Sequence, residues 1–178
     1  METFREALIT EPGKIILHEV EKKTPGSGEV MIKVVSSAIC GSDMHLYSGR
    51  HPYAKLPTTV GHELAGVIEE IGADVTKFKV GDRVCVEPLI ACGHCYYCQR
   101  GRYDYCETLR LKYRSGSSGY ADYYYAEERW VHLLPDGISF DEGALMEPLA
   151  CTVHAAMKAR IQLCDSVCVK VGGQAVLG

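Results

Sequence analysis

The sequence of 178 residues lacks three features that would place it in a broad class at once. It has no apolar run of about 18 residues, which excludes a transmembrane helix. It has no basic excess, because 19 Lys and Arg stand against 23 Asp and Glu, and this excludes the charge pattern of a nucleic-acid or acidic-membrane binder. Its first residues, Met1–Glu6, lack the basic and apolar segments of a signal peptide.

Cysteine, in contrast, is abundant, and the count of nine is odd. Without a secretory signal, such a content indicates a reducing compartment and metal-bound thiolates instead of a disulfide framework. We therefore expect a cytoplasmic protein that binds neither nucleic acid nor membrane.

Runs rich in β-branched residues predict strands at Lys14–Val20 and Glu29–Val35, and the glycine-containing segment Thr24–Gly28 between them predicts a turn. A later run, Tyr120–Tyr125, predicts another strand. Its tyrosines are expected to pack, because no basic residues alternate with them as in a base-stacking platform. Short strands joined by such turns favour a mainly β, α+β fold of barrel type with a few helices.

A helix is predicted to begin at Ser139, because Ser139 and Glu142 have the spacing of a capping box. The residue before a proline is disfavoured in helical conformation, so we expect a break at Glu147, before Pro148, with helix resuming over Leu149–Ala159. A carboxylate at a break among apolar residues is either a metal ligand or an exposed group at a kink.

Four cysteines give the sharpest signal in the sequence: Cys92, Cys95, Cys98 and Cys106. Four thiols at such short spacing can enclose one tetrahedral zinc ion and leave no open position, as structural zinc sites do. A ferredoxin-type iron–sulfur site would place the fourth cysteine closer to the third, with a proline after it. Structural zinc is therefore favoured over an iron–sulfur cluster or disulfides.

Two other segments carry metal-binding side chains. The segment Cys40–His45 offers a thiol, a hydroxyl, a carboxylate and an imidazole. His62 and Glu63 are adjacent, and neighbouring side chains on extended backbone point to opposite faces. One of the pair can therefore enter a coordination shell while the other supports it or serves as an alternate ligand. The same segment continues with Gly66, Gly72 and Val75, whose spacing from His62 forms part of one pattern.

These motifs resemble the zinc-dependent medium-chain alcohol and polyol dehydrogenases, on the side of the sorbitol and threonine dehydrogenases. The resemblance rests on Cys-x-Ser-Asp-x-His at Cys40–His45, on the pattern from Gly61 to Val75, and on the four-cysteine lobe. It implies a GroES-like catalytic domain over residues 1–160, built as a partly open β-barrel with a structural-zinc lobe at about residues 88–112. It also implies two zinc ions per chain and a homo-oligomer.

The resemblance also implies roles for individual residues. Cys40, His62 and either Glu63 or Glu147 would bind the catalytic zinc. Ser42 would take the proton of the substrate hydroxyl, and His45 would pass it towards solvent. Asp43 would accept the second ring N–H of His62, as the outer partners of zinc-bound histidines do.

The reaction implied is the oxidation of a polyol or another secondary alcohol to a ketone with NAD(P), assisted by zinc as a Lewis acid. Sorbitol, xylitol, threonine and butanediol are all compatible substrates. An alternative is a truncated, inactive zinc-binding module used in assembly, which needs only the four lobe cysteines. A zinc-ribbon nucleic-acid binder is opposed by the acidic composition.

Residues 161–178 are expected to be either the remnant of a Rossmann first strand or a closing strand of the catalytic domain. Val167–Val171 has the composition of a strand but includes a lysine, whereas a parallel strand covered on both faces is continuously apolar. The glycines Gly172, Gly173 and Gly178 do not complete the dinucleotide fingerprint. We therefore expect the nucleotide-binding domain to be absent or truncated, and this chain to bind no nicotinamide by itself.

Overall fold

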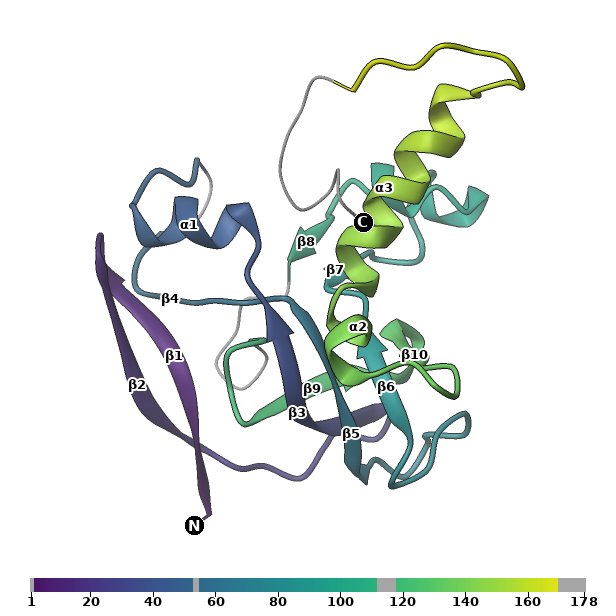
Figure 1. The fold of residues 1–178 in the computed structure, drawn as a ribbon. Helices are drawn as coiled ribbons and strands as arrows, with labels where there is room; N and C mark the ends of the chain where they lie inside the picture. Colours follow the sequence, from purple (N-terminus) through teal and green to yellow (C-terminus); the bar gives the residue numbers. More distant parts are fainter. Residues whose placement is uncertain (1, 53–54, 112–117, 170–178) are drawn as a thin grey trace.

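The computed structural model describes residues 2–52, 55–111 and 118–169, and the fold is mainly β (Figure 1). Its strands are β1 (Thr3–Glu11), β2 (Lys14–Glu21), β3 (Glu29–Ala38), β4 (Thr58–Thr59), β5 (Glu63–Ile71), β6 (Arg83–Val86), β7 (Leu89–Ile90), β8 (Arg110–Leu111), β9 (Tyr123–Glu127) and β10 (Val131–Leu133). The α-helices are α1 (Gly41–Tyr47), α2 (Phe140–Ala144) and α3 (Met146–Ala159), and the 3₁₀ helices are η1 (Cys98–Arg100), η2 (Tyr103–Tyr105) and η3 (Glu128–Trp130).

The strands form three sheets, in the orders β2-β1-β4, β10-β6-β5-β3-β9 and β7-β8. Every pairing between strands is antiparallel. The five-stranded sheet curls into half of a barrel, with the β1–β2 hairpin on one side and α2 and α3 on the other (Figure 1). This architecture confirms the expected mainly β, GroES-like fold.

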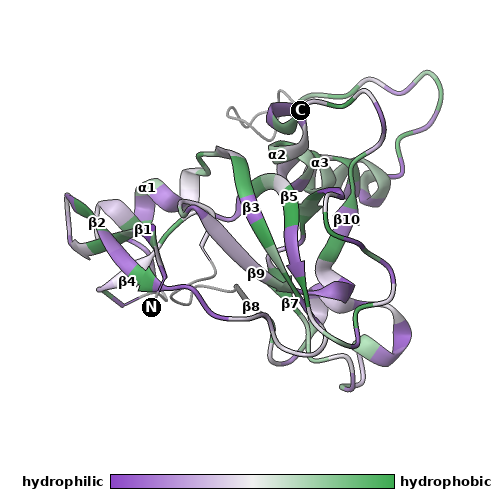
Figure 2. Ribbon diagram, turned by 90° about the horizontal axis from the view of Figure 1, so that it is seen from below, coloured by the Kyte–Doolittle hydropathy of each residue, from purple (hydrophilic) through white to green (hydrophobic). Residues whose placement is uncertain are grey.

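The first part of strand β3 is buried on both faces, and β3 pairs with β5 and β9 in the five-stranded sheet. Val30 and Ile32 pack on one side with Leu64 and Ile68 of β5, where all four side chains are at most 1% exposed. Met31 points to the other side and packs with Phe4 of β1 and a tyrosine of β9. Each fully buried aliphatic side chain contributes about 1.5–3 kcal/mol to folding. Figure 2 shows the apolar residues along β3 and β5.

The predicted helix start is confirmed, because Ser139 caps α2 and Glu142 completes the capping box. The predicted break at Glu147 is wrong. The chain breaks at Leu145, between α2 and α3, and Glu147 is helical in the first turn of α3. Pro148 also lies in that first turn, where a helix loses no internal hydrogen bond to a residue without an N–H.

The end of the chain is only partly described. Residues 161–169 follow α3 without forming a strand, and Val167 and Val169 are 57% and 65% exposed. The rest of the predicted strand Val167–Val171, and Gly172, Gly173 and Gly178, lie outside the described residues. Within the described part of the chain, no helix has both the length and the apolar character needed to cross a membrane.

Candidate metal centres

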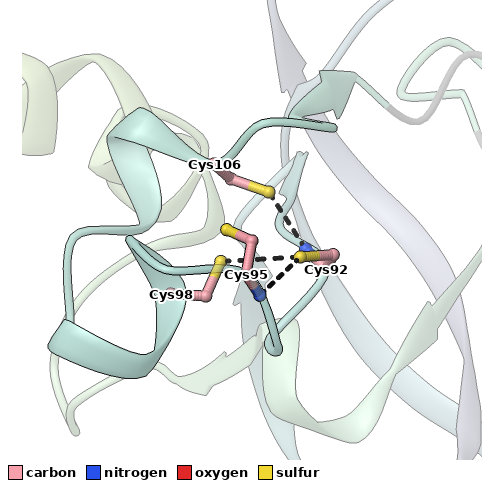
Figure 3. Close-up of side chains that lie close together, drawn as sticks. All are labelled: Cys92, Cys95, Cys98 and Cys106. Carbon is pink, nitrogen blue, oxygen red and sulfur yellow. Dashed lines mark hydrogen bonds between the residues drawn. The ribbon is translucent and has the colours of Figure 1, made fainter.

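The four lobe cysteines come together as predicted (Figure 3). Their sulfur atoms face one another, and all four lie within 4.8 Å of each other. The Sγ atoms of Cys92 and Cys98 are 3.9 Å apart. Two thiolates on one tetrahedral zinc ion are separated by about 3.8 Å, given a Zn–S bond of about 2.3 Å. The donor set and its spacing therefore fit zinc.

Short local hydrogen bonds hold the sulfur atoms in place. The backbone N–H of Cys92 donates to Cys106 Sγ at 3.3 Å, and that of Cys95 donates to Cys92 Sγ at 3.3 Å. The bond from Cys92 is the main reason that the pKa of Cys106 is lowered to about 6. Burial raises the pKa of Cys98 to about 12, with a further contribution from its neighbouring thiols. A bound cation would favour the thiolate form of all four groups.

The lobe has its own small apolar cluster. Cys98 and Cys106 are buried together with Ala91 and Trp130. Trp130 is the only tryptophan of the chain. All nine cysteines are free thiols in the structure.

A second cluster forms from residues far apart in the sequence. Cys40, His62 and Glu63 each offer one ligand atom, and these atoms lie within 4.8 Å of one another. His62 is 7% exposed and Glu63 is 1% exposed, whereas Cys40 is partly exposed. The cluster thus combines two buried donors with one that solvent reaches.

The sheet register brings this cluster together. Ala38, at the end of β3, pairs with Glu63, at the start of β5, so Cys40 follows close to that pair. Cys40 is the N-cap residue of α1. Gly61 has φ +92°, a left-handed conformation that favours glycine. His62 precedes β5, and both it and Glu63 reach the cluster, so the two do not separate onto opposite faces as expected.

Asp43 lies beside the imidazole of His62, but the distance between them is longer than a hydrogen bond. Its Oδ1 atom is 3.6 Å from His62 Nδ1, and its Oδ2 atom accepts a hydrogen bond from the backbone N–H of Cys40 at 3.0 Å. Burial disfavours the charged imidazole, but Cys40 and Asp43 outweigh this and raise the pKa of His62. The hydrogen bond with His62 in turn lowers the pKa of the Cys40 thiol.

Glu147 lies near the cluster but is not one of the three donors. It is half-buried in α3, and burial raises the pKa of its carboxyl while the charge of His62 opposes the rise. One turn further along α3, the Cys151 thiol is 4.0 Å from Glu147 Oε1. Cys151 was not considered at the sequence level, although its spacing of four from Glu147 places the two on one helix face.

The two residues predicted to move protons both lie on α1. Ser42 is half-buried next to Cys40, and its hydrogen bonds help to lower the pKa of the Cys40 thiol. His45 lies in the last turn of α1 and is exposed. No hydrogen bond joins Ser42 to His45 in the part of the chain that the structure describes.

Sequence reasoning also missed Tyr120, to which it gave only a packing role. Tyr120 precedes β9, and its hydroxyl donates to Asp43 Oδ2 at 2.8 Å. Burial, followed by the carboxylate of Asp43, raises the pKa of Tyr120, so that the phenol remains a donor. Nothing in the tyrosine-rich run distinguishes Tyr120 as the residue that contacts Asp43.

Comparison with known proteins gives the family. Residues 26–136 match the model of the alcohol dehydrogenase GroES-like domain. The chain is 41% identical over 158 residues to a sorbitol dehydrogenase of Halalkalibacterium halodurans, covering 88% of this chain and 46% of the relative. It is 34% identical over 175 residues to the starvation-sensing protein RspB of Escherichia coli, covering 98% of this chain and 51% of that relative.

A solved structure agrees with the sequence relatives. The 2R,3R-butanediol dehydrogenase of Bacillus subtilis superposes with a TM-score of 0.78 at 33% identity, covering 89% of this chain and 48% of that structure. The chain therefore belongs to the zinc-type medium-chain alcohol dehydrogenases, a family of oxidoreductases, through its GroES-like domain. It spans about half the length of the curated relatives it matches.

Proposed function

We propose that this chain is the zinc-binding catalytic domain of an alcohol or polyol dehydrogenase, which oxidises a secondary alcohol to a ketone with NAD(P). The observation that carries the proposal is the second cluster, in which Cys40, His62 and Glu63 converge away from the four lobe thiols. A structural zinc module would need only the lobe. Three protein donors of mixed type are the usual set of a catalytic zinc site, which leaves one position for water or substrate.

When bound, zinc would supply a Lewis acid that makes an alcohol hydroxyl more acidic. Around it, Asp43 would hold the ring of His62 by its Nδ1 atom, which leaves Nε2 to face the ion. Ser42 would accept the substrate proton beside Cys40, and His45, exposed on the same helix, would release it to solvent. Glu147 would serve as an alternate donor to Glu63.

The remaining assignments follow the same reasoning. The catalytic domain would cover residues 1–160, and Cys92, Cys95, Cys98 and Cys106 would hold a structural zinc in the lobe at about residues 88–112. Residues 161–178 would begin the cofactor domain or close the catalytic one. A related Escherichia coli dehydrogenase was solved with NADH, which supports a nicotinamide as hydride acceptor of the whole protein. The free thiols suit the cytoplasm, and we expect a homo-oligomer.

Zinc content tests the proposal. The purified chain should hold two zinc ions by inductively coupled plasma mass spectrometry. Cys40→Ala should hold one and keep the lobe folded, because the lobe thiols do not depend on Cys40. Cys164→Ala removes an exposed thiol outside both clusters and should keep two ions.

Substrate binding gives a second readout. With Co²⁺ in place of zinc, sorbitol should change the visible absorption of the wild-type chain but not that of Cys40→Ala. A single ion in the wild-type chain, unaffected by Cys40→Ala, would contradict the proposal and favour an inactive assembly module.

A further inference from the structure

We propose that Tyr120 is a positioning residue for the Cys40–His62–Glu63 site, which it organises through Asp43. The inference rests on the proposed function of that site, because its consequence is measured on the metal bound there. The hydroxyl of Tyr120 is 2.8 Å from Asp43 Oδ2 and 3.0 Å from the carbonyl oxygen of Ala38. These two acceptors flank Cys40 in the sequence, so one hydroxyl contacts the chain on both sides of a proposed ligand.

The hydrogen bonds to Asp43 set the direction of its carboxylate. Asp43 is 3% exposed, and its Oδ2 atom accepts from both Tyr120 and the backbone N–H of Cys40. With Oδ2 held by two donors, Oδ1 faces His62 Nδ1 at 3.6 Å and has no hydrogen bond among the described residues. Tyr120 therefore fixes the carboxylate in the rotation that presents Oδ1 to the imidazole.

Tyr120 also contacts the backbone just before His62. The N–H of Tyr120 donates to the carbonyl of Val60 at 3.3 Å, and that of Gly119 donates to Gly61 at 2.7 Å. A Cβ atom at Gly61 would lie 2.6 Å from Cδ1 of Tyr120, so the ring packs directly on the residue before His62. The position of His62 is thus limited on two sides by one tyrosine.

Packing against Gly61 does not require the hydroxyl of Tyr120. A phenylalanine would present the same ring to Gly61, and burying a hydroxyl without a partner costs free energy. The hydroxyl finds its partners in Asp43 and the carbonyl of Ala38, and a phenylalanine would remove both contacts without creating a large cavity. Tyr120→Phe consequently separates the positioning role from the packing role.

The test compares Tyr120→Phe with Tyr123→Phe. The hydroxyl of Tyr123 belongs to neither cluster and donates a hydrogen bond of 3.0 Å to Glu69. Competition between the protein and a chelator for zinc should show weaker binding at the Cys40 site of Tyr120→Phe. The loss should be at most the roughly 10- to 100-fold that removal of the outer partner Asp43 itself would cause. The Co²⁺ absorption of that site should also change, while the lobe ion stays bound. Tyr123→Phe should leave both sites unchanged.

A double-mutant cycle shows whether Tyr120 acts through Asp43. In an Asp43→Ala background, Tyr120→Phe should cause little further loss of zinc, whereas independent effects would add. If Asp43→Ala does not fold, the comparison with Tyr123→Phe decides alone. Equal zinc affinity in Tyr120→Phe and wild type, or additive losses in the cycle, would overturn the inference. A wild-type chain that holds only the lobe ion would instead overturn the proposed function.

Discussion

The two candidate metal centres of this chain are assembled in opposite ways. The lobe takes all four thiols from one short segment, Cys92–Cys106, and local backbone N–H groups hold the sulfur atoms. The second site takes Cys40 from the end of β3 and the start of α1, and His62 and Glu63 from the entry to β5. The first can be encoded by spacing alone, whereas the second exists only if the sheet pairs in the correct register.

The two sites also differ in their donors and in their access to solvent. Four thiols enclose a metal ion and leave no position for another ligand. A thiol, an imidazole and a carboxylate, with Cys40 partly exposed, leave room for one. The comparison predicts that damage to the lobe costs stability, while damage to the second site costs metal affinity with less effect on the fold.

The largest effect is expected from Cys106→Ala. Metal binding at a four-thiol site is coupled to folding, so loss of one thiol should release the lobe ion and lower the melting temperature more than any change at the second site. Trp130 packs against the lobe cysteines, so its fluorescence should shift to the red as water reaches it. A melting curve and emission spectrum equal to those of Cys164→Ala would contradict a structural role.

A smaller effect is expected from Gly61→Ala. The substitution combines a left-handed backbone with a clash against Tyr120, and should cost about 3 kcal/mol in urea unfolding. The matched control is Gly137→Ala, since Gly137 has φ +88° and no atom within 4 Å of an added Cβ. Gly137→Ala should cost about 1–2 kcal/mol and leave zinc binding intact.

Gly61→Ala should also weaken zinc at the second site, while the lobe ion stays bound. Equal unfolding free energies and zinc contents in the two glycine variants would show that the contact with Tyr120 does not shape the site.

The smallest change in stability is expected for substitutions of Glu63 and Glu147. For these two variants the quantity to compare is the zinc affinity of the second site. Glu63→Gln should weaken zinc at the second site by more than about 10-fold, because Glu63 lies within the donor cluster. Glu147→Gln should weaken it by less than about 10-fold, because Glu147 lies outside the three-donor cluster and its charge acts on His62. The reverse order, measured by chelator competition, would make Glu147 the ligand.

Several expectations from the sequence held because they depend on local chemistry. The strands at Lys14–Val20 and Glu29–Val35 and the capping box at Ser139 rest on neighbouring residues, and all are present in the fold. The break at Glu147 failed because the bias against helix before proline is weak in a first turn, where Pro148 is tolerated.

The sequence by itself determined the mainly β class and the four-thiol lobe, because β-branched runs, turn residues and cysteine spacing act over a few residues. It also supplied Cys40, His62 and Glu63 as donors. Only the tertiary structure decided that these three meet, since the pairing of Ala38 with Glu63 brings them together. It also decided that Tyr120 reaches Asp43, a contact between residues 77 positions apart. Such contacts depend on sheet register and on the left-handed turn at Gly61, which no local pattern of residue types encodes.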